Sequence, residues 1–147
     1  MYNRILIATD GSPLSDKAVE HGLTLAALTR ATVVALKVVP HYPRSYFDGG
    51  MSVDANEIKR IEAQWGSAAQ ALVDGVKAQG SAQGITVKAL IAKSDLVAEA
   101  IIAAAKQHDC DVIVMASHGR NGLKRLLLGS ETQHVLTHSH IPVLVLR

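Results

Sequence analysis

The sequence is poor in aromatic side chains and in cysteine. Aromatic residues make up only 3% of the chain, so its core must be aliphatic, and base-stacking platforms for single-stranded nucleic acid are not expected. Cys110 is the single cysteine, which excludes an internal disulfide and suits a reducing compartment. The formal net charge of +2 is too small to indicate a nucleic-acid-binding protein.

The chain is short and has no long apolar run. Its 147 residues suffice for one domain with a proper core and are too few for two, so residues 1–147 are expected to form a single domain. The first apolar stretch, residues 5–8, is too short for a signal peptide or a membrane span. We therefore expect a cytoplasmic protein that contacts neither nucleic acid nor membrane.

Several motifs of nucleotide and hydrolase chemistry are also missing. The sequence contains no Gly-x-x-x-x-Gly-Lys-Ser/Thr loop, which argues against a Walker-type NTPase. No Gly-x-Gly-x-x-Gly follows the first apolar run and no Gly-x-Ser-x-Gly elbow occurs, which argues against dinucleotide enzymes and α/β-hydrolases. Because no nucleophile forms a convincing pair with a base, we predict no catalytic residues.

Five short apolar runs alternate with helical patterns along the chain. They cover residues 5–9, 32–39, 85–92, 111–117 and 142–146. Such alternation predicts an α/β fold with a five-stranded parallel sheet and helices on both faces, a doubly wound, Rossmann-like domain. The first, second and fourth runs are almost wholly apolar, as central strands are, whereas the third alternates like an edge strand. We expect the strand order 3-2-1-4-5, which these patterns allow.

Helix signals lie between these runs. Ser12-Pro13 predicts an N-cap followed by proline at the first helical position. Ser94-Asp95 opens a helix after the third run, and Ser130-Glu-Thr-Gln133 matches the capping-box pattern for a helix before the last run. Three- and four-residue spacing predicts one buried face on a long second helix, formed by Ile58, Ile61, Trp65, Ala68, Leu72 and Val76.

Polar, glycine-containing segments follow two of the apolar runs. In open parallel sheets, ligands bind beyond the carboxyl ends of the strands where the winding reverses, here between the first and fourth strands. Thr9-Asp10-Gly11-Ser12 follows the first run, and Ser117-His118-Gly119 follows the fourth. A helix then opens near Gly129-Ser130, and the free N–H groups of a helix start favour phosphate. The sequence therefore predicts an anionic ligand at this edge of the sheet.

Two of these features have ordinary structural interpretations as well. Gly119 and Gly122 can simply allow a tight loop, and Ser130 can simply cap its helix. His134 and His138 are four residues apart and could together bind zinc, but a solvated helix face is favoured because no glutamate follows His134. We therefore predict no metal site formed by protein side chains alone.

The motifs taken together resemble a known family. A first strand ending in Thr-Asp-Gly-Ser, a late Val-Met-Ala-Ser-His-Gly-Arg, then Leu-Leu-Leu-Gly-Ser and a closing Ile-Pro-Val-Leu-Val are similar to the universal stress protein family over essentially the whole chain. Its nucleotide-binding branch carries Gly-x2-Gly-x9-Gly-Ser/Thr, which falls here on Ala116, Gly119, Gly129 and Ser130. The spacing is kept, but the first glycine is Ala116, which is tolerable at negative φ and strained at positive φ.

The resemblance implies a role for each segment in binding ATP. Contacts with the phosphates are implied for Gly119, Gly129, Ser130, Glu131 and Thr132. The adenine would be framed by Ala8, Thr9, Val38 and Met115. The ribose, the phosphates or a phosphate-bound magnesium ion would lie near Asp10, Ala116, Ser117 and His118. Positive charge comes from Arg120, Lys124 and Arg125, and we hypothesise that it strengthens polyphosphate binding.

The resemblance further implies an ATP-binding signalling or regulatory protein of the stress response, with at most slow ATP hydrolysis or self-phosphorylation. One alternative is a protein-interaction module of the same fold with a vestigial nucleotide pocket. Another is a true nucleotide-processing enzyme, which would need a positioned base or a metal site. The last run, Val143 to Leu146, is apolar on both faces yet expected at a sheet edge, which predicts a homodimer built on this strand.

Overall fold

The computed structural model describes residues 1–43, 54–119 and 128–147. Within these ranges, five strands form one sheet: β1 (Arg4–Ala8), β2 (Thr32–Val39), β3 (Val87–Lys93), β4 (Val112–Ala116) and β5 (Val143–Leu146). Their order is β3-β2-β1-β4-β5, and every neighbouring pair is parallel. The predicted sheet and its strand order are therefore confirmed.

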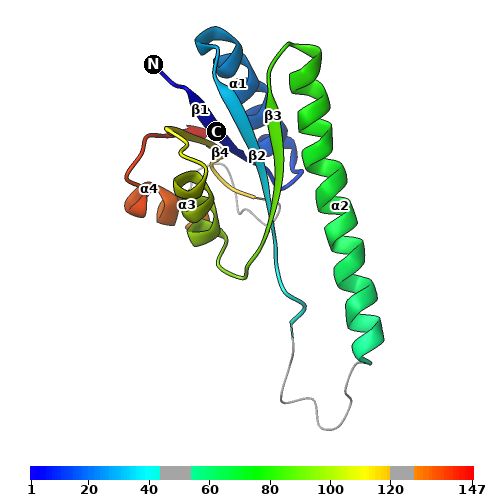
Figure 1. Cartoon of the computed structure of the whole chain (residues 1–147). Helices are drawn as coiled ribbons and strands as arrows, with labels where there is room; N and C mark the ends of the chain where they lie inside the picture. The colour runs from blue at the N-terminus through cyan, green and yellow to red at the C-terminus, as the bar shows by residue number, and fades with distance from the viewer. Residues whose placement is uncertain (44–53, 120–127) are drawn as a thin grey trace.

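In the described part of the chain, four helices cover the two faces of the sheet (Figure 1). They are α1 (Pro13–Thr29), α2 (Ala55–Ala82), α3 (Val97–Gln107) and α4 (Ser130–His138). Residues of α1 and α2 join one apolar core, and residues of α3 and α4 join the other. Among the described helices, none is both long and apolar enough to cross a membrane.

The central strands are apolar throughout because each face of the sheet has its own core. Along β1, Ile5 and Ile7 belong to the core under α1 and α2, whereas Leu6 belongs to the core under α3 and α4. All three side chains are 0% exposed. β4 shows the same alternation, which places Val114 in the first core and Ile113 in the second. A continuous apolar run thus results from burial on both sides.

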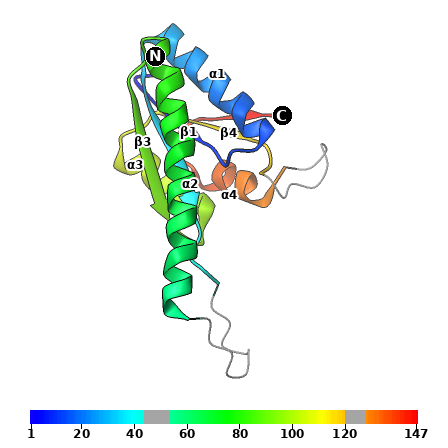
Figure 2. The ribbon, with the colours of Figure 1, turned by 90° about the vertical axis from the view of Figure 1, so that its right-hand side faces the viewer.

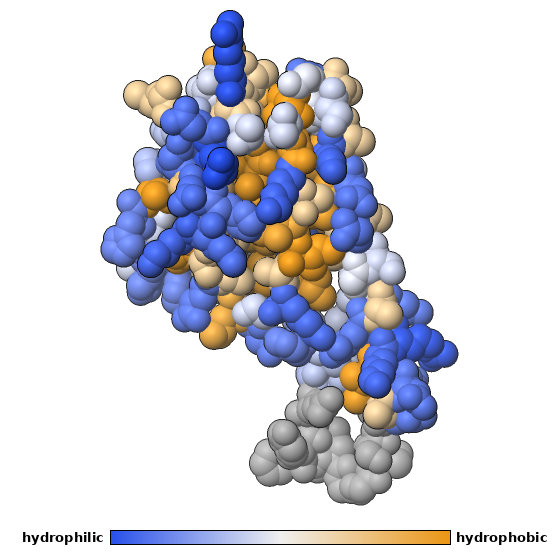
Figure 3. Space-filling view, viewed as in Figure 1, coloured by the Kyte–Doolittle hydropathy of each residue, from blue (hydrophilic) through white to orange (hydrophobic). Residues whose placement is uncertain are grey.

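β3 lies at the edge of the sheet, as its alternating pattern predicted. Val87 is buried and its neighbour Lys88 is exposed. Further along the strand, Leu90 and Ala92 pack against the core under α3 and α4 but stay half-buried. Figure 3 shows apolar residues gathered in the middle of this face, between α3 and α2. The layer of α3 and α4 therefore leaves part of its side of the sheet uncovered.

The prediction of the buried face of α2 is wrong for most of the residues that it names. The buried residues of this helix are Ala69, Val73, Val76 and Gly80. Of the predicted stripe only Val76 is buried, Ala68 is exposed, and the remaining four are half-buried. The N-terminal turns of α2 extend past the end of β3 (Figures 1 and 2), so no sheet lies beneath them. The periodicity of the sequence predicted the helix correctly, but it does not show how much of the helix lies over the sheet.

Candidate functional site

The bends that follow β1 and β4 lie against each other. These strands are neighbours in the sheet, with Ile7 paired to Val114. A Cβ atom built on Gly119, after β4, would lie 2.7 Å from Oδ2 of Asp10, after β1. A side chain at position 119 would therefore require the Asp10 carboxylate to move. The two segments that the sequence singled out separately therefore form one rim of the sheet.

The bend after β1 is held by its own side chains. The Ser12 N–H donates to Oδ1 of Asp10 at 2.9 Å, and the Gly11 N–H donates to the Thr9 hydroxyl at 3.3 Å. Gly11 has a φ of 79°, a conformation that glycine adopts without strain. Ser12 caps α1 by accepting the Ser15 N–H at 3.2 Å, so the predicted N-cap is confirmed. Asp10 is thereby held at the rim, half-buried.

Three of the side chains predicted to frame adenine share one face of the sheet. Ala8, Val38 and Met115 come from β1, β2 and β4, which are adjacent, and all three belong to the core under α3 and α4. Val38 is 8% exposed and Met115 is 6% exposed. The fourth, Thr9, differs: its hydroxyl lies 3.1 Å from Oγ of Ser15 in α1. Its side chain is engaged on the opposite face of the sheet.

Ala116, which replaces a glycine of the family pattern, is unstrained. It ends β4 and pairs with Leu146 of β5. Among the described residues, the only non-glycine positions with positive φ are Arg30 and Asp109, so Ala116 has an ordinary backbone conformation. Side chains alternate along a strand, and Val114 belongs to the core under α1. The Ala116 methyl therefore points to that face, away from Ala8, Val38 and Met115.

The start of α4 is anchored to the end of β4. The Gly129 N–H donates to the Ser117 carbonyl at 2.8 Å, and the Ser117 N–H donates to the Leu146 carbonyl at 2.7 Å. A Cβ atom on Gly129 would lie 3.3 Å from the Ser117 carbonyl oxygen and 3.4 Å from Cα of His118. Thr132, 2% exposed, donates its hydroxyl to the Ala116 carbonyl at 3.0 Å. Glycine at 129 therefore allows α4 to start against the bend after β4.

The capping box predicted at Ser130 is wrong. The N-cap is Gly129, whose carbonyl accepts the Gln133 N–H at 3.0 Å, and it has no side chain to cap the helix. Ser130 is instead the first helical residue and is exposed. The backbone bond from Gly129 to Ser117 fixes the helix start one residue earlier than the pattern indicates.

α4 differs from the other described helices in which groups accept hydrogen bonds from its first-turn N–H groups. Side-chain oxygens accept N–H groups at the start of the other three described helices: Ser12 does so for α1, Asp54 for α2, and Glu131, which itself lies in α4, for α3. Among the described residues, no side chain does so for α4. The first N–H groups of a helix have no partner within the helix and suit an anion. With respect to the described residues, the first turn of α4 thus offers N–H donors next to the bend after β4, the bend to which Gly119 belongs.

The remaining predicted residues lie in different surroundings. Glu131 accepts the Ala98 N–H of α3 at 2.8 Å. His118 is half-buried, with Nδ1 3.3 Å from the Gly119 carbonyl oxygen, and Gly119 is exposed. Arg120, and with it Lys124 and Arg125, lies outside the described residues.

The histidine pair of α4 and the single cysteine show no features of a functional site. The rings of His134 and His138 stack with centroids 4.2 Å apart on the surface of α4, and the described residues contain no cluster of three or more metal-ligating side chains. Burial raises the pKa of the Cys110 thiol to about 11, which keeps the thiol neutral and unreactive.

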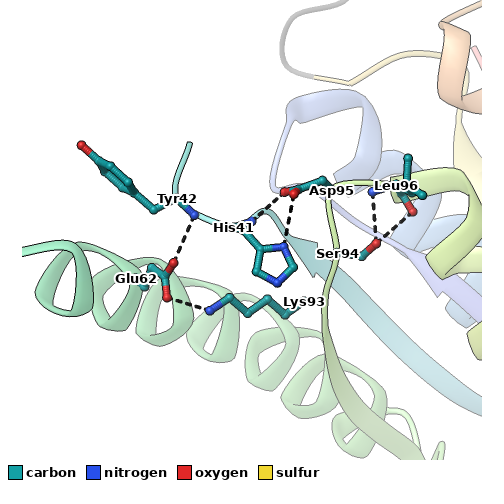
Figure 4. Close-up of polar contacts among 7 residues, drawn as sticks. All are labelled: His41, Tyr42, Glu62, Lys93, Ser94, Asp95 and Leu96. Atoms are coloured by element: carbon teal, nitrogen blue, oxygen red, sulfur yellow. Dashed lines mark hydrogen bonds and ion pairs between the residues drawn. The ribbon is translucent and has the colours of Figure 1, made fainter. Parts of the chain in front are cut away.

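A second polar cluster, which sequence reasoning missed, lies at the ends of β2 and β3 (Figure 4). Asp95 accepts the His41 N–H at 2.8 Å, and Glu62 of α2 accepts the Tyr42 N–H at 3.1 Å. Lys93 forms an ion pair with Glu62 at 2.7 Å and lowers the pKa of that carboxyl group. The cluster lines an open cleft of about 500 Å³. It clamps residues 41 and 42 to α2 and to the end of β3.

Comparison with known proteins identifies the family. The family model described as "Universal stress protein family" matches residues 1–147. Universal stress protein MJ0531 of Methanocaldococcus jannaschii is 31% identical over 147 residues, which cover 100% of this chain and 83% of that protein.

Solved structures share the fold. That of MJ0577, with 29% identity, gives a TM-score of 0.84 and covers 99% of this chain and 96% of that one. A universal stress protein in complex with cAMP gives 0.72 at 22% identity, covering 99% and 97% of the two chains. One from Archaeoglobus fulgidus in complex with dAMP gives 0.65 at 17% identity, covering 99% and 98%. The chain belongs to the universal stress protein family.

Proposed function

We propose that residues 1–147 form one domain that binds an adenine nucleotide, with ATP as the ligand, and acts as a signalling or regulatory protein of the stress response. The observation that carries this proposal is the start of α4, which has no side-chain cap among the described residues. It follows the bend after β4, in which a Cβ atom on Gly119 would lie 2.7 Å from Oδ2 of Asp10. Family members with bound cAMP and dAMP support an adenine nucleotide as the ligand.

The residues present fit such a ligand. Gly119 and Gly129 let the bend after β4 lie close to Asp10 and to the start of α4, so the first-turn N–H groups of α4 that follow Gly129 lie next to this bend, where phosphate oxygens could accept them. Ser130 adds an exposed hydroxyl at the same helix start. On the α3 and α4 face, the half-buried Ala8, with the buried Val38 and Met115 beside it, would give the adenine an apolar contact. A carboxylate suits magnesium, and Asp10 at the rim would hold an ion bound to the phosphates.

Chemical turnover by this site should be slow. A fast hydrolase needs a base within hydrogen-bond reach of the attacking water. Asp10 is the carboxylate at the rim, and its Oδ1 already accepts the Ser12 N–H. Slow hydrolysis or self-phosphorylation is therefore the most that we propose.

We also propose a cytoplasmic homodimer built on β5. This strand pairs with β4 on one side and is the last in the sheet, so its other edge can pair with a second copy of the chain. Leu144 is 41% exposed, which leaves apolar surface for such a contact. Sedimentation at micromolar concentration tests this assembly, and a monomer would contradict it.

Calorimetric titration with ATP and AMP, each with and without magnesium, tests the binding proposal. Gly119→Val should abolish or strongly weaken binding, because the new side chain would enter the space of the Asp10 carboxylate. Gly75→Val is the matched control, since no atom lies within 4 Å of that Cβ position. Normal ATP binding by Gly119→Val would refute the phosphate site. No heat with any nucleotide would favour an interaction module with a vestigial pocket, and rapid product formation would favour an enzyme.

A further inference from the structure

Glu131 occupies a position where its charge could harm the proposed phosphate site. It is the second residue of α4, in the same first turn whose N–H groups have no side-chain partner among the described residues. A carboxylate there is attracted to the positive end of its own helix. If it folded back onto that turn, it would occupy the donors and repel phosphate groups.

The structure directs this carboxylate elsewhere. Oε2 of Glu131 accepts the Ala98 N–H at 2.8 Å, in the first turn of α3. The N-cap residue of α3 is Leu96, which has no oxygen in its side chain and makes no side-chain cap. α3 and α4 lie side by side (Figure 1). Glu131 thus supplies α3 with the cap that its own sequence lacks, and the positive end of α3 stabilises the carboxylate.

We infer that the bond from Ala98 to Glu131 keeps the negative charge of Glu131 away from the first turn of α4: by capping α3, the carboxylate leaves those N–H groups to the phosphates. This inference rests on the proposed function. It also differs from what the family resemblance implied, because Glu131 acts through α3 and does not contact the nucleotide.

Two variants of Glu131 separate the carboxylate's charge from its hydrogen bond, and a third variant, at another position, is their control. Glu131→Gln removes the charge but keeps an oxygen that can accept the Ala98 N–H. Glu131→Asp keeps the charge, but the side chain is one methylene shorter and loses its reach to α3. Glu99→Asp is the matched control, since Glu99 lies exposed in the first turn of α3 and no side-chain contact to it is found among the described residues.

Calorimetry at low and high salt should rank these proteins. Glu131→Gln and Glu99→Asp should keep wild-type ATP affinity. Glu131→Asp should bind ATP about fivefold more weakly, the order that Coulomb's law gives for a carboxylate several ångströms from two or three phosphate charges in water. AMP, with less charge, should lose less affinity, and added salt should reduce the ATP defect.

Two results would overturn the inference. If Glu131→Gln loses as much affinity as Glu131→Asp, the carboxylate itself contacts the nucleotide or its metal ion. If Glu131→Asp weakens ATP and AMP equally at every salt concentration, the residue is only a structural cap.

Hydrogen exchange gives a readout that does not depend on the ligand. The Ala98 amide should exchange slowly in the wild type and in Glu131→Gln, and faster in Glu131→Asp and Glu131→Ala. A wild type that binds nucleotide while its Ala98 amide exchanges freely would refute this inference alone. A wild type with a protected Ala98 amide that binds no adenine nucleotide would refute the proposed function, and the role of Glu131 with it.

Discussion

A substitution at Gly22 in α1 tests the packing of this helix, because one close contact determines whether the unfolding free energy rises or falls. A Cβ atom at this position would lie 2.5 Å from Cδ1 of Ile7 and 2.7 Å from its Cγ1. Non-bonded carbon atoms prefer separations of about 3.5–4.0 Å, so Gly22→Ala requires a movement of about 1 Å. Ile7 is 0% exposed and lies in the central strand β1. Its β-branched side chain has little freedom to turn aside.

The expected loss of stability is the difference between two terms. Overpacking of this kind costs about 1–3 kcal/mol. Alanine in a helix recovers about 1 kcal/mol relative to glycine. Gly22→Ala should therefore lose about 1 kcal/mol of unfolding free energy. Gly75→Ala in α2 meets no atom within 4 Å, so only the helix term applies and the variant should gain about 1 kcal/mol.

Urea denaturation should move the two midpoints in opposite directions with equal m-values. Ile7→Val removes the Cδ1 atom that the new methyl group meets, at a cost of about 0.5–1.5 kcal/mol when made alone. The double variant Gly22→Ala with Ile7→Val should lose less than the sum of the two single changes. If Gly22→Ala stabilises the protein as Gly75→Ala does, α1 does not approach β1 as described, and the reasoning fails.

The structure also predicts the direction of change in three other measurements, on Cys110, Glu62 and Thr132. Because the pKa of Cys110 is raised to about 11, the native thiol should react with Ellman's reagent at pH 8 far more slowly than the unfolded protein; equal rates would contradict its burial. The Lys93 ion pair lowers the pKa of Glu62 below its ordinary value of 4.5, so its stabilisation is present at neutral pH and is lost as the pH falls through the folded-state pKa. When the pH is lowered below 4.5, the unfolding free energy of Glu62→Gln should fall less than that of the wild type. If both proteins show the same pH dependence, the ion pair does not contribute to stability. Thr132→Val removes the buried donor to the Ala116 carbonyl and should cost about 1–3 kcal/mol in urea denaturation. Thr132→Ser keeps the donor and loses only a buried methyl group, so it should cost less than Thr132→Val.

The fold could be predicted because its signals are local and repeated. Runs buried on both faces become apolar throughout, as in β1, whereas the edge strand β3 alternates. These patterns indicated which runs are central and which lies at an edge, and they allow the observed strand order without determining it. The meeting of Asp10 with Gly119 was also predictable, since a parallel sheet brings the carboxyl ends of neighbouring strands to one rim.

Contacts between distant segments could not be predicted in the same way. Glu131 and Ala98 are 33 residues apart, and His41 and Asp95 are 54 apart. No spacing rule links such pairs, because their partners depend on which helices become neighbours in space. The buried face of α2 failed for a related reason: helical periodicity does not state where the sheet beneath the helix ends.

The start of α4 shows why a local pattern and a functional site can be confused. Ser130-Glu-Thr-Gln133 satisfies the capping-box rule, yet the helix begins at Ser130 because Gly129 is bound to the Ser117 carbonyl. The glutamate that a sequence pattern would place beside this helix start is engaged by α3. A helix start is open to an anion only when both its own residues and its neighbours leave the N–H groups free. Among the described residues, the position of the Glu131 side chain is therefore one condition for phosphate binding at α4, and the arrangement of α3 and α4 determines that position.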